Sequence, residues 1–231
     1  MDKTGKLIVK DKDIVVPGEE LASGMDYLPA DGAFRRDDKV IAFYLGLVNI
    51  NGRLIKVIPL NGRYVAKKGD TVIGEIADIN FGGWQVDIGS SYRANLSIKD
   101  ATSDFINKGS DLTQYYNFGD LIVANVTNVI RNKIVDLTMR GPGLKKIVGG
   151  RIIFIKPSKV PRVIGKQGTM ILMIKDKTNC NIIIGQNGRI WISGENSKQE
   201  KLASDAIKLI EENAHIDGLT DRVKKYLEDS K

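Results

Sequence analysis

Val163-Ile164-Gly165-Lys166-Gln167-Gly168-Thr169-Met170-Ile171 is the stretch that decides the fold of the C-terminal third of this chain. Two glycines enclose a lysine and a glutamine, and apolar residues lie on both sides. Because glycine has no Cβ, a Gly-x-x-Gly turn lets a backbone phosphate approach closely. The N-terminus of a following helix favours an anion at the same place. The stretch therefore predicts a phosphate-holding loop made by Gly165, Lys166, Gln167 and Gly168.

The elements around this loop are expected in a definite order. The pattern predicts a strand at 151–156, a short helix at 159–164, a helix at 169–178, a strand at 180–184, an Asn-Gly turn at 186–189 and a strand at 190–193. Ser197-x-x-Glu200 then indicates a capping box that opens a long helix, and one more helix is expected after Gly218. This β-α-α-β-β-α order is that of a eukaryote-type KH domain, which binds about four nucleotides of single-stranded nucleic acid.

Charge supports a nucleic-acid ligand for this third. From Lys145 to Arg189 the chain has seven Lys and three Arg against a single acid, Asp176. A run of charge is usually a solvated face, but this one surrounds a predicted phosphate loop. We therefore add Lys159 and Arg162 to the predicted RNA contacts.

Composition limits the class of protein. The chain has 231 residues, 42% hydrophobic, a net charge of +7 and a pI near 9.3, enough for two domains or three small ones. One cysteine, Cys180, excludes an internal disulfide framework and fits a reducing cytosol. No apolar run is long enough for a membrane span, and the polar start is not a signal peptide. We expect a cytoplasmic protein that contacts no membrane.

Residues 65–144 show five strand-like runs, which predict a five-stranded Greek-key barrel of the OB fold. The runs are 70–79, 84–88, 91–96, 120–130 and 132–139. Phe81, Tyr92 and Arg93 lie where the first three strands could present rings and a guanidinium to bases, and Arg131 adds a basic candidate. Each aromatic side chain could instead fill the barrel core, and this simpler interpretation is strongest for Trp84.

Residues 1–64 predict a small β domain. Strands are expected at 6–10, 13–16, 40–48 and 53–60, with a turn at Asn51-Gly52. Ten bases against nine acids leave this part almost neutral, so it is not an electrostatic RNA binder. A docking module is the stronger interpretation, and an appendage without a partner is the alternative. The third domain, 145–231, is the KH domain with its C-terminal helix.

No catalytic constellation is visible. The one histidine, His215, ends a helix without an obvious partner, no Cys/His set has metal-ligand spacing, and Gly165 to Gly168 is too short for a nucleotidase phosphate loop. We predict no cofactor and no metal site. The sequence carries equipment for binding RNA but none for cleaving it.

The combination resembles the RNA-binding cap subunit of the archaeal exosome, the ribosomal-RNA-processing protein four family, with a barrel of the ribosomal S-one type. The resemblance covers essentially the whole chain. It rests on Val16-Pro17-Gly18-Glu19, on Pro59-Leu60-x-x-Arg63-Tyr64 before Gly69-Asp70, on Leu137-Thr138-Met139-Arg140-Gly141-x-Gly143-Leu144, on the stretch from Pro157 to Gly168, and on Gly185-Gln186-Asn187-Gly188. Asp31-Gly32-Ala33-Phe34 departs from the Gly-x-Gly-Thr turn of the family.

The resemblance implies a non-catalytic subunit. Three copies would sit on a hexameric ring of ribonuclease PH-like subunits, bind single-stranded RNA and thread its 3′ end to phosphorolytic sites in the ring. Two alternatives remain open from the residues themselves. One is a free-standing RNA-binding regulator of translation or ribosome assembly, and the other is a nuclease in its own right, which would need a cluster that the sequence does not show.

Overall fold

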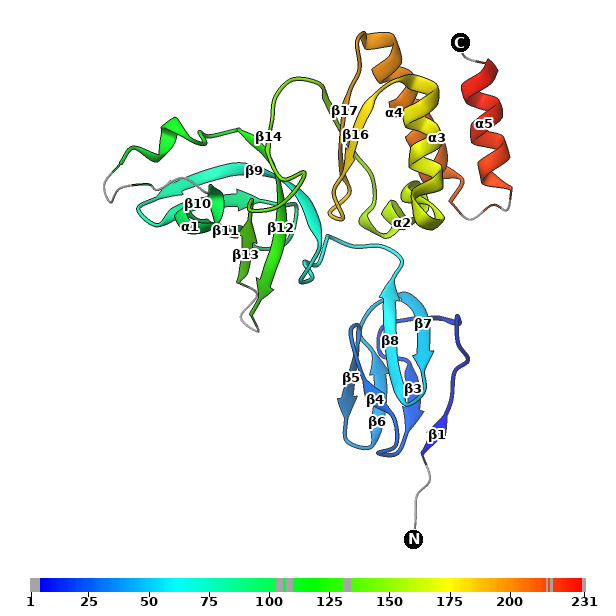
Figure 1. Cartoon of the computed structure of the whole chain (residues 1–231). Helices are drawn as coiled ribbons and strands as arrows, with labels where there is room; N and C mark the ends of the chain where they lie inside the picture. Colours follow the sequence, from blue (N-terminus) through cyan, green and yellow to red (C-terminus); the bar gives the residue numbers. More distant parts are fainter. Residues whose placement is uncertain are drawn as a thin grey trace. The chain divides into compact units, whose positions relative to one another are not determined.

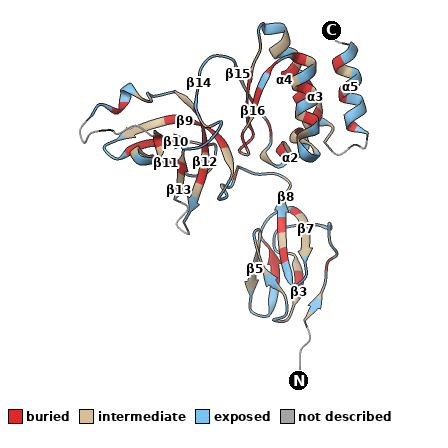
Figure 2. Cartoon of the chain, viewed as in Figure 1, coloured by how far each residue is buried: buried red, intermediate tan, exposed pale blue. Residues whose placement is uncertain are grey.

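The computed structural model describes residues 5–102, 106, 110–130, 134–214, 216 and 218–229. It divides into two compact units, Met1–Gly62 and Arg63–Lys231 (Figure 1). Each unit has its own hydrophobic core, and Figure 2 shows buried residues recurring along the strands of both. The second unit contains both the barrel and the KH-like part.

The first unit is built from two four-stranded sheets around a common core of small and branched apolar residues. One sheet has the order β1-β3-β6-β5 and the other β2-β7-β8-β4. Their strands are β1 (Lys6–Leu7), β2 (Ile14–Val15), β3 (Glu20–Ser23), β4 (Leu28–Pro29), β5 (Ala33–Arg36), β6 (Lys39–Ala42), β7 (Gly46–Asn51) and β8 (Leu54–Pro59). The expected turn at Asn51-Gly52 joins β7 to β8, with Asn51 opposite Leu54.

The continuous strand expected at 40–48 is wrong. The chain leaves one sheet after Ala42 and enters the other at Gly46, and Phe43, Tyr44 and Leu45 between them are exposed. A Cβ on Gly46 would lie 2.5 Å from the Ile58 carbonyl oxygen, so glycine lets β7 start close against β8. The unbroken apolar run concealed this crossing, because exposed and buried apolar residues look alike in a sequence. The sequence also did not indicate β3, β4 and β5.

The barrel is closed, as predicted. Its strands follow the order β13-β11-β10-β9-β12, and β12 pairs again with β13 to complete the ring. The parallel pairing of β11 with β13 is the only parallel contact among the described barrel strands. The elements are β9 (Thr71–Asn80), β10 (Gly83–Asp87), β11 (Ala94–Ser97), α1 (Ile98–Ala101), η1 (Leu112–Gln114), β12 (Leu121–Val129), β13 (Val135–Thr138) and β14 (Lys146–Ile147).

The C-terminal part has the predicted β-α-α-β-β-α order. Its elements are β15 (Arg151–Phe154), η2 (Pro157–Lys159), α2 (Val160–Ile164), η3 (Lys166–Gly168), α3 (Thr169–Thr178), β16 (Asn181–Ile184), β17 (Arg189–Ser193), α4 (Ser197–Glu212) and α5 (Leu219–Asp229). The sheet order is β15-β17-β16. The core joins the sheet to α2, α3, α4 and α5, and it includes Cys180, whose pKa is raised by burial.

The capping box at Ser197 and Glu200 predicts Ser197 as the N-cap of the long helix. In the structure the N-cap is one position earlier. Asn196 is the N-cap, and its side chain accepts a hydrogen bond from the Gln199 N–H at 2.9 Å. Gln199 reaches back to the Glu195 N–H, and Glu200 accepts from the Gly194 N–H. Asparagine and serine are comparable N-caps, so the predicted register, which begins at Ser197, is wrong by one position.

The barrel and the KH-like part share a fourth apolar cluster. Ile73 and Val123 of the barrel and Ile147 of β14 pack against Trp191 of β17, and each of the four is at least nine-tenths buried. The sheet therefore presents one face to its own helices and the other to β9 and β12. Such an apolar seam holds the barrel and the KH-like part as one body.

Candidate nucleic-acid interface

The glycine loop of the KH-like part has the backbone that its glycines predict. Gly165 has φ +77°, and a Cβ there would lie 2.7 Å from the Met170 Cβ. Gly168 has φ +79°, and a Cβ there would meet no described atom within 4 Å. Gln167 between them also has a positive φ, of 53°. Gly165 is thus needed for packing against α3, whereas Gly168 leaves open space in which a phosphate could approach.

The basic residues near this loop have different surroundings. Lys166 is exposed and Lys159 is half-buried. Arg162 is exposed, but its Nη2 donates to the Ile216 carbonyl oxygen at 3.0 Å, which ties α2 to the segment before α5. Lys166 is therefore the predicted contact whose position best suits a phosphate, and all three stay predictions.

A second candidate surface lies on the barrel. Phe81, at the turn between β9 and β10, has a fully exposed ring. Beside this turn is a hollow of 390 Å³ formed by the ends of β9, β10, β11, β12 and β13. Its polar lining includes Asn80, Asn95, Ser97, Asp100, Thr127 and Asp136. The interpretation of Phe81 as barrel core is therefore wrong.

Trp84 follows the simpler interpretation. Its side chain is 2% exposed in the barrel core, and its Nε1 donates to the Tyr116 carbonyl oxygen at 2.9 Å. The Tyr116 ring meets it edge-on, with centroids 5.2 Å apart. Burial on all sides excludes Trp84 from base stacking in this conformation.

Tyr92 and Arg93 lie at the other end of the β10–β11 hairpin from Phe81. The ladder of β10 with β11 runs from Gly83, opposite Ser97, to Val86, opposite Ala94. Phe81 precedes this ladder and Tyr92 and Arg93 are in its far loop, where both are exposed. The predicted RNA contacts of the barrel therefore lie in two separate places, with Phe81 at one end of the hairpin and Tyr92 and Arg93 at the other. Arg131 lies outside the described residues, as does His215.

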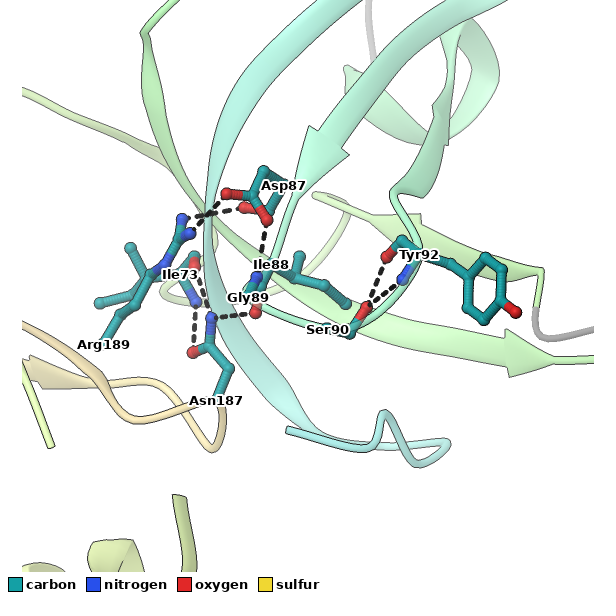
Figure 3. A network of polar contacts seen from close by, with 8 residues as sticks. All are labelled: Ile73, Asp87, Ile88, Gly89, Ser90, Tyr92, Asn187 and Arg189. Carbon is teal, nitrogen blue, oxygen red and sulfur yellow. Dashed lines mark hydrogen bonds and ion pairs between the residues drawn. The ribbon is translucent and has the colours of Figure 1, made fainter. Parts of the chain in front are cut away.

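The sequence predicts Asn187 only as part of a turn and does not reveal its contact with the barrel. Its side chain is buried in the seam, where Oδ1 accepts from the Ile73 N–H at 3.3 Å and Nδ2 donates to the carbonyl oxygens of Ile73 (2.7 Å) and Ile88 (2.9 Å) (Figure 3). The Gln186 N–H donates to the Thr71 carbonyl oxygen at 2.8 Å. One KH-side turn therefore binds β9 and the residue that follows β10.

Close contacts explain why two positions of this turn are glycines. A Cβ on Gly185 would lie 2.2 Å from the Asn187 Oδ1, and one on Gly188 would lie 2.2 Å from the Ile155 carbonyl oxygen. Gly188 also has φ +81°, which favours glycine. Gly185 thus leaves room for the Asn187 side chain, which reaches Ile73 114 positions away, and Gly188 lets the turn lie against Ile155.

Arg189 follows the same turn and forms an ion pair across the seam. Its Nη1 donates to the Asp87 carbonyl oxygen at 2.9 Å, and its Nη2 donates to the Asp87 carboxylate at 2.8 Å. Burial alone would raise the pKa of Asp87. The Gly89 N–H, Arg189 and the nearby charge of Arg93 outweigh burial, so that the pKa is lowered. The guanidinium is also 5.9 Å from the ring of Phe154.

Sequence models of known domains match both parts of the second unit. The model described as "RRP4, S1 domain" matches residues 63–128, and a KH domain model matches residues 150–198. The exosome complex component Rrp4 of Methanothermus fervidus is 46% identical over 222 residues, covering 96% of this chain and 97% of the relative. The chain belongs to the Rrp4 family.

Other members and a solved structure agree. Rrp4 of Pyrococcus abyssi is 45% identical over 225 residues, covering 96% of this chain and 84% of that relative. The crystal structure of a proposed exosome complex RNA-binding protein aligns with a TM-score of 0.67 and 39% identity, over 73% of this chain and 97% of the other. The Rrp4 resemblance and the S1-plus-KH fold expected from the sequence are confirmed.

No group of three or more His, Cys, Asp and Glu side chains in the described ranges is arranged to hold a metal ion. Of the helices in these ranges, none has the length and apolar character to cross a membrane.

Proposed function

We propose that this chain is a non-catalytic, cytoplasmic subunit of an exosome that binds single-stranded RNA. In this proposal three copies sit on a hexameric ring of ribonuclease PH-like subunits and deliver the RNA 3′ end to it for 3′–5′ degradation and processing. Membership of the Rrp4 family supports the assembly, and the paired S1 and KH domains support the RNA ligand. The observation that carries the RNA role is the exposed Phe81 ring beside a polar hollow of the barrel.

The hollow suits bases better than phosphates. Asp100 and Asp136 line it, and their charge would repel a phosphate. Their oxygens, with the amides of Asn80 and Asn95, can instead accept hydrogen bonds from base amino groups. An exposed phenylalanine ring offers a base a stacking surface, and stacking tolerates every base because each has a π-face. A base stacked on Phe81 would thus place its edge near these acceptors.

Docking on the ring is assigned to the first unit. Phe43, Tyr44 and Leu45 form an exposed apolar corner between β6 and β7, and the Phe43 ring also meets Phe34 edge-on, with centroids 6.0 Å apart. Within residues 40–48 of the proposed docking segments, this corner is exposed, whereas residues 40–42 are buried. In the other segment, residues 6–10, the side chains of Lys6, Ile8 and Lys10 are exposed as well. A contact of standard size would bury on the order of 800 Å² per partner.

Reconstitution tests this function. With end-labelled single-stranded RNA, the purified chain alone should leave the RNA intact, and the ring should shorten it faster when the chain is added. The chain should also co-migrate with the ring in size-exclusion chromatography. RNA shortening by the chain alone would favour a nuclease. RNA binding without co-migration would favour the free-standing regulator.

A further inference from the structure

We propose that Asp87 and Arg189 are positioning residues for RNA binding: the KH-side turn fixes the barrel loop at 88–93, which presents Tyr92 and Arg93 to RNA. This inference rests on the proposed RNA-binding function. In addition to any contact of its own glycine loop with RNA, the KH-like part would hold this barrel loop in position.

The start of the loop is held from the KH side. Arg189 is 9% exposed and grips both the carbonyl and the carboxylate of Asp87. Asp87 Oδ1 in turn accepts from the Gly89 N–H at 2.8 Å. The carbonyl oxygen of Ile88, the residue after Asp87, accepts a hydrogen bond from Asn187 Nδ2. The turn of the other part therefore holds Asp87 and Ile88 directly, and Asp87 in turn holds Gly89 (Figure 3).

The rest of the loop is closed on itself. The Ser90 hydroxyl donates to the Tyr92 carbonyl oxygen, and the Tyr92 N–H donates back to Ser90 Oγ at 3.4 Å. These bonds couple the position of Tyr92 to the anchored residues before it. Figure 3 shows the Tyr92 ring pointing away from the Arg189 network, and Tyr92 is 53% exposed. The loop thus combines a fixed base with an exposed aromatic tip.

Arg93 belongs to the same charge group. It lies in the exposed loop that follows β10, and its positive charge helps to lower the pKa of Asp87. The bonds that hold Asp87 and Ile88 limit the positions that the exposed side chains of this loop can take. Preorganisation of this kind improves affinity because less freedom is lost on binding.

Substitution Asp87→Asn separates positioning from simple electrostatics by the sign of its effect. Removing an acid beside an RNA path should strengthen binding if charge alone matters, because repulsion of phosphates is reduced. Asparagine keeps one acceptor oxygen and replaces the other with an NH₂ group, so either the Arg189 or the Gly89 bond is lost. Positioning therefore predicts weaker binding, with Kd raised about fivefold, as expected when one charge-assisted hydrogen bond is lost.

Glu75→Gln is the matched control. Glu75 is exposed opposite Asp87 on β9, so its substitution removes the same charge from the neighbouring strand position. Fluorescence anisotropy with a labelled single-stranded oligonucleotide should show unchanged or tighter binding for Glu75→Gln. It should show weaker binding for Asp87→Asn. Unchanged or tighter binding for Asp87→Asn would overturn the proposal.

Amide hydrogen exchange gives a readout without RNA. In the full chain, Asp87→Asn should speed exchange in peptides covering 88–93 and leave peptides of α3 and α4 unchanged. Unchanged exchange at 88–93 would overturn the positioning role whatever the RNA result. If exchange rises in Asp87→Asn but the wild-type chain binds no RNA, the proposed RNA-binding function is overturned, and with it the role of the loop in RNA binding. The anchoring of the loop by the KH-side turn would still be supported.

Discussion

The Asn187 side chain acts as a strand neighbour for Ile73. Its Oδ1 accepts from the Ile73 N–H at 3.3 Å and its Nδ2 donates to the Ile73 carbonyl oxygen at 2.7 Å. A side-chain amide has the same donor and acceptor as a peptide group, so it can satisfy both backbone groups of one residue. This contact, buried on both sides, joins the KH-like part to the barrel.

Asn187→Ala should lower the free energy of unfolding of the Arg63–Lys231 unit by about 2–4 kcal/mol, because three buried hydrogen bonds are lost and their backbone partners stay buried. Urea unfolding followed by tryptophan fluorescence measures the change. Asn181→Ala, at an exposed position of β16, serves as control and should change stability by less than about 0.5 kcal/mol. Equal effects of the two substitutions would remove Asn187 from its structural role.

Local signals in the sequence predicted the elements of the KH-like part well. α3 spans Thr169–Thr178 as expected, and the helix after Gly218 is present as α5, with Leu219, Val223 and Leu227 buried. Glycine turns, caps and apolar periodicity act over a few residues, so they can be read from a sequence. The partner of Asn187 could not be read, because a turn already explains an Asn-Gly pair and Ile73 is 114 positions away.

The candidate site was predictable only in part. Phe81 and Trp84 are three positions apart in one apolar stretch, yet one ring is fully exposed and the other is buried. Which ring faces the core depends on the turn between β9 and β10 and on the register of the closed barrel, and both are tertiary features. The exposed corner at Phe43 was hidden for the same reason.

Acidification should weaken the seam through Asp87. Its pKa is lowered in the folded chain, so the folded state favours the carboxylate. The stabilisation is present above the ordinary value of 3.8 and is lost as pH falls through the lowered folded value. Urea midpoints measured between about pH 6 and pH 2.5 should therefore fall more for the wild type than for Asp87→Asn. Parallel pH profiles would show that this carboxylate does not contribute.

Lys166→Ala should weaken RNA binding nearly uniformly across sequences if the glycine loop holds a phosphate. The slope of log K against log salt concentration should fall by about 0.7 for one lost contact with single-stranded RNA. Lys201→Ala, which removes an exposed charge from α4, is the control and should leave the slope unchanged. The same slope for wild type and Lys166→Ala would mean that the KH-like part contributes structure and not phosphate binding.

Phe43→Ser combined with Leu45→Ser should abolish co-migration of the chain with the ring, because the exposed apolar corner would no longer be buried favourably at a contact. RNA binding by the free chain should be retained, as should its unfolding midpoint, since both side chains are exposed. Phe81→Ala is the reciprocal control and should co-migrate normally. Full assembly of the double variant would place docking elsewhere in the chain.

The most direct test of the account is the affinity of the full chain for single-stranded RNA with and without the Phe81 ring. Base stacking on an aromatic side chain contributes about 1–3 kcal/mol, so Phe81→Ala should raise Kd by roughly tenfold or more. Phe43→Ala removes an equally hydrophobic exposed ring from the first unit and should leave Kd unchanged. Equal Kd values for wild type, Phe81→Ala and Phe43→Ala would contradict the barrel surface as the RNA site.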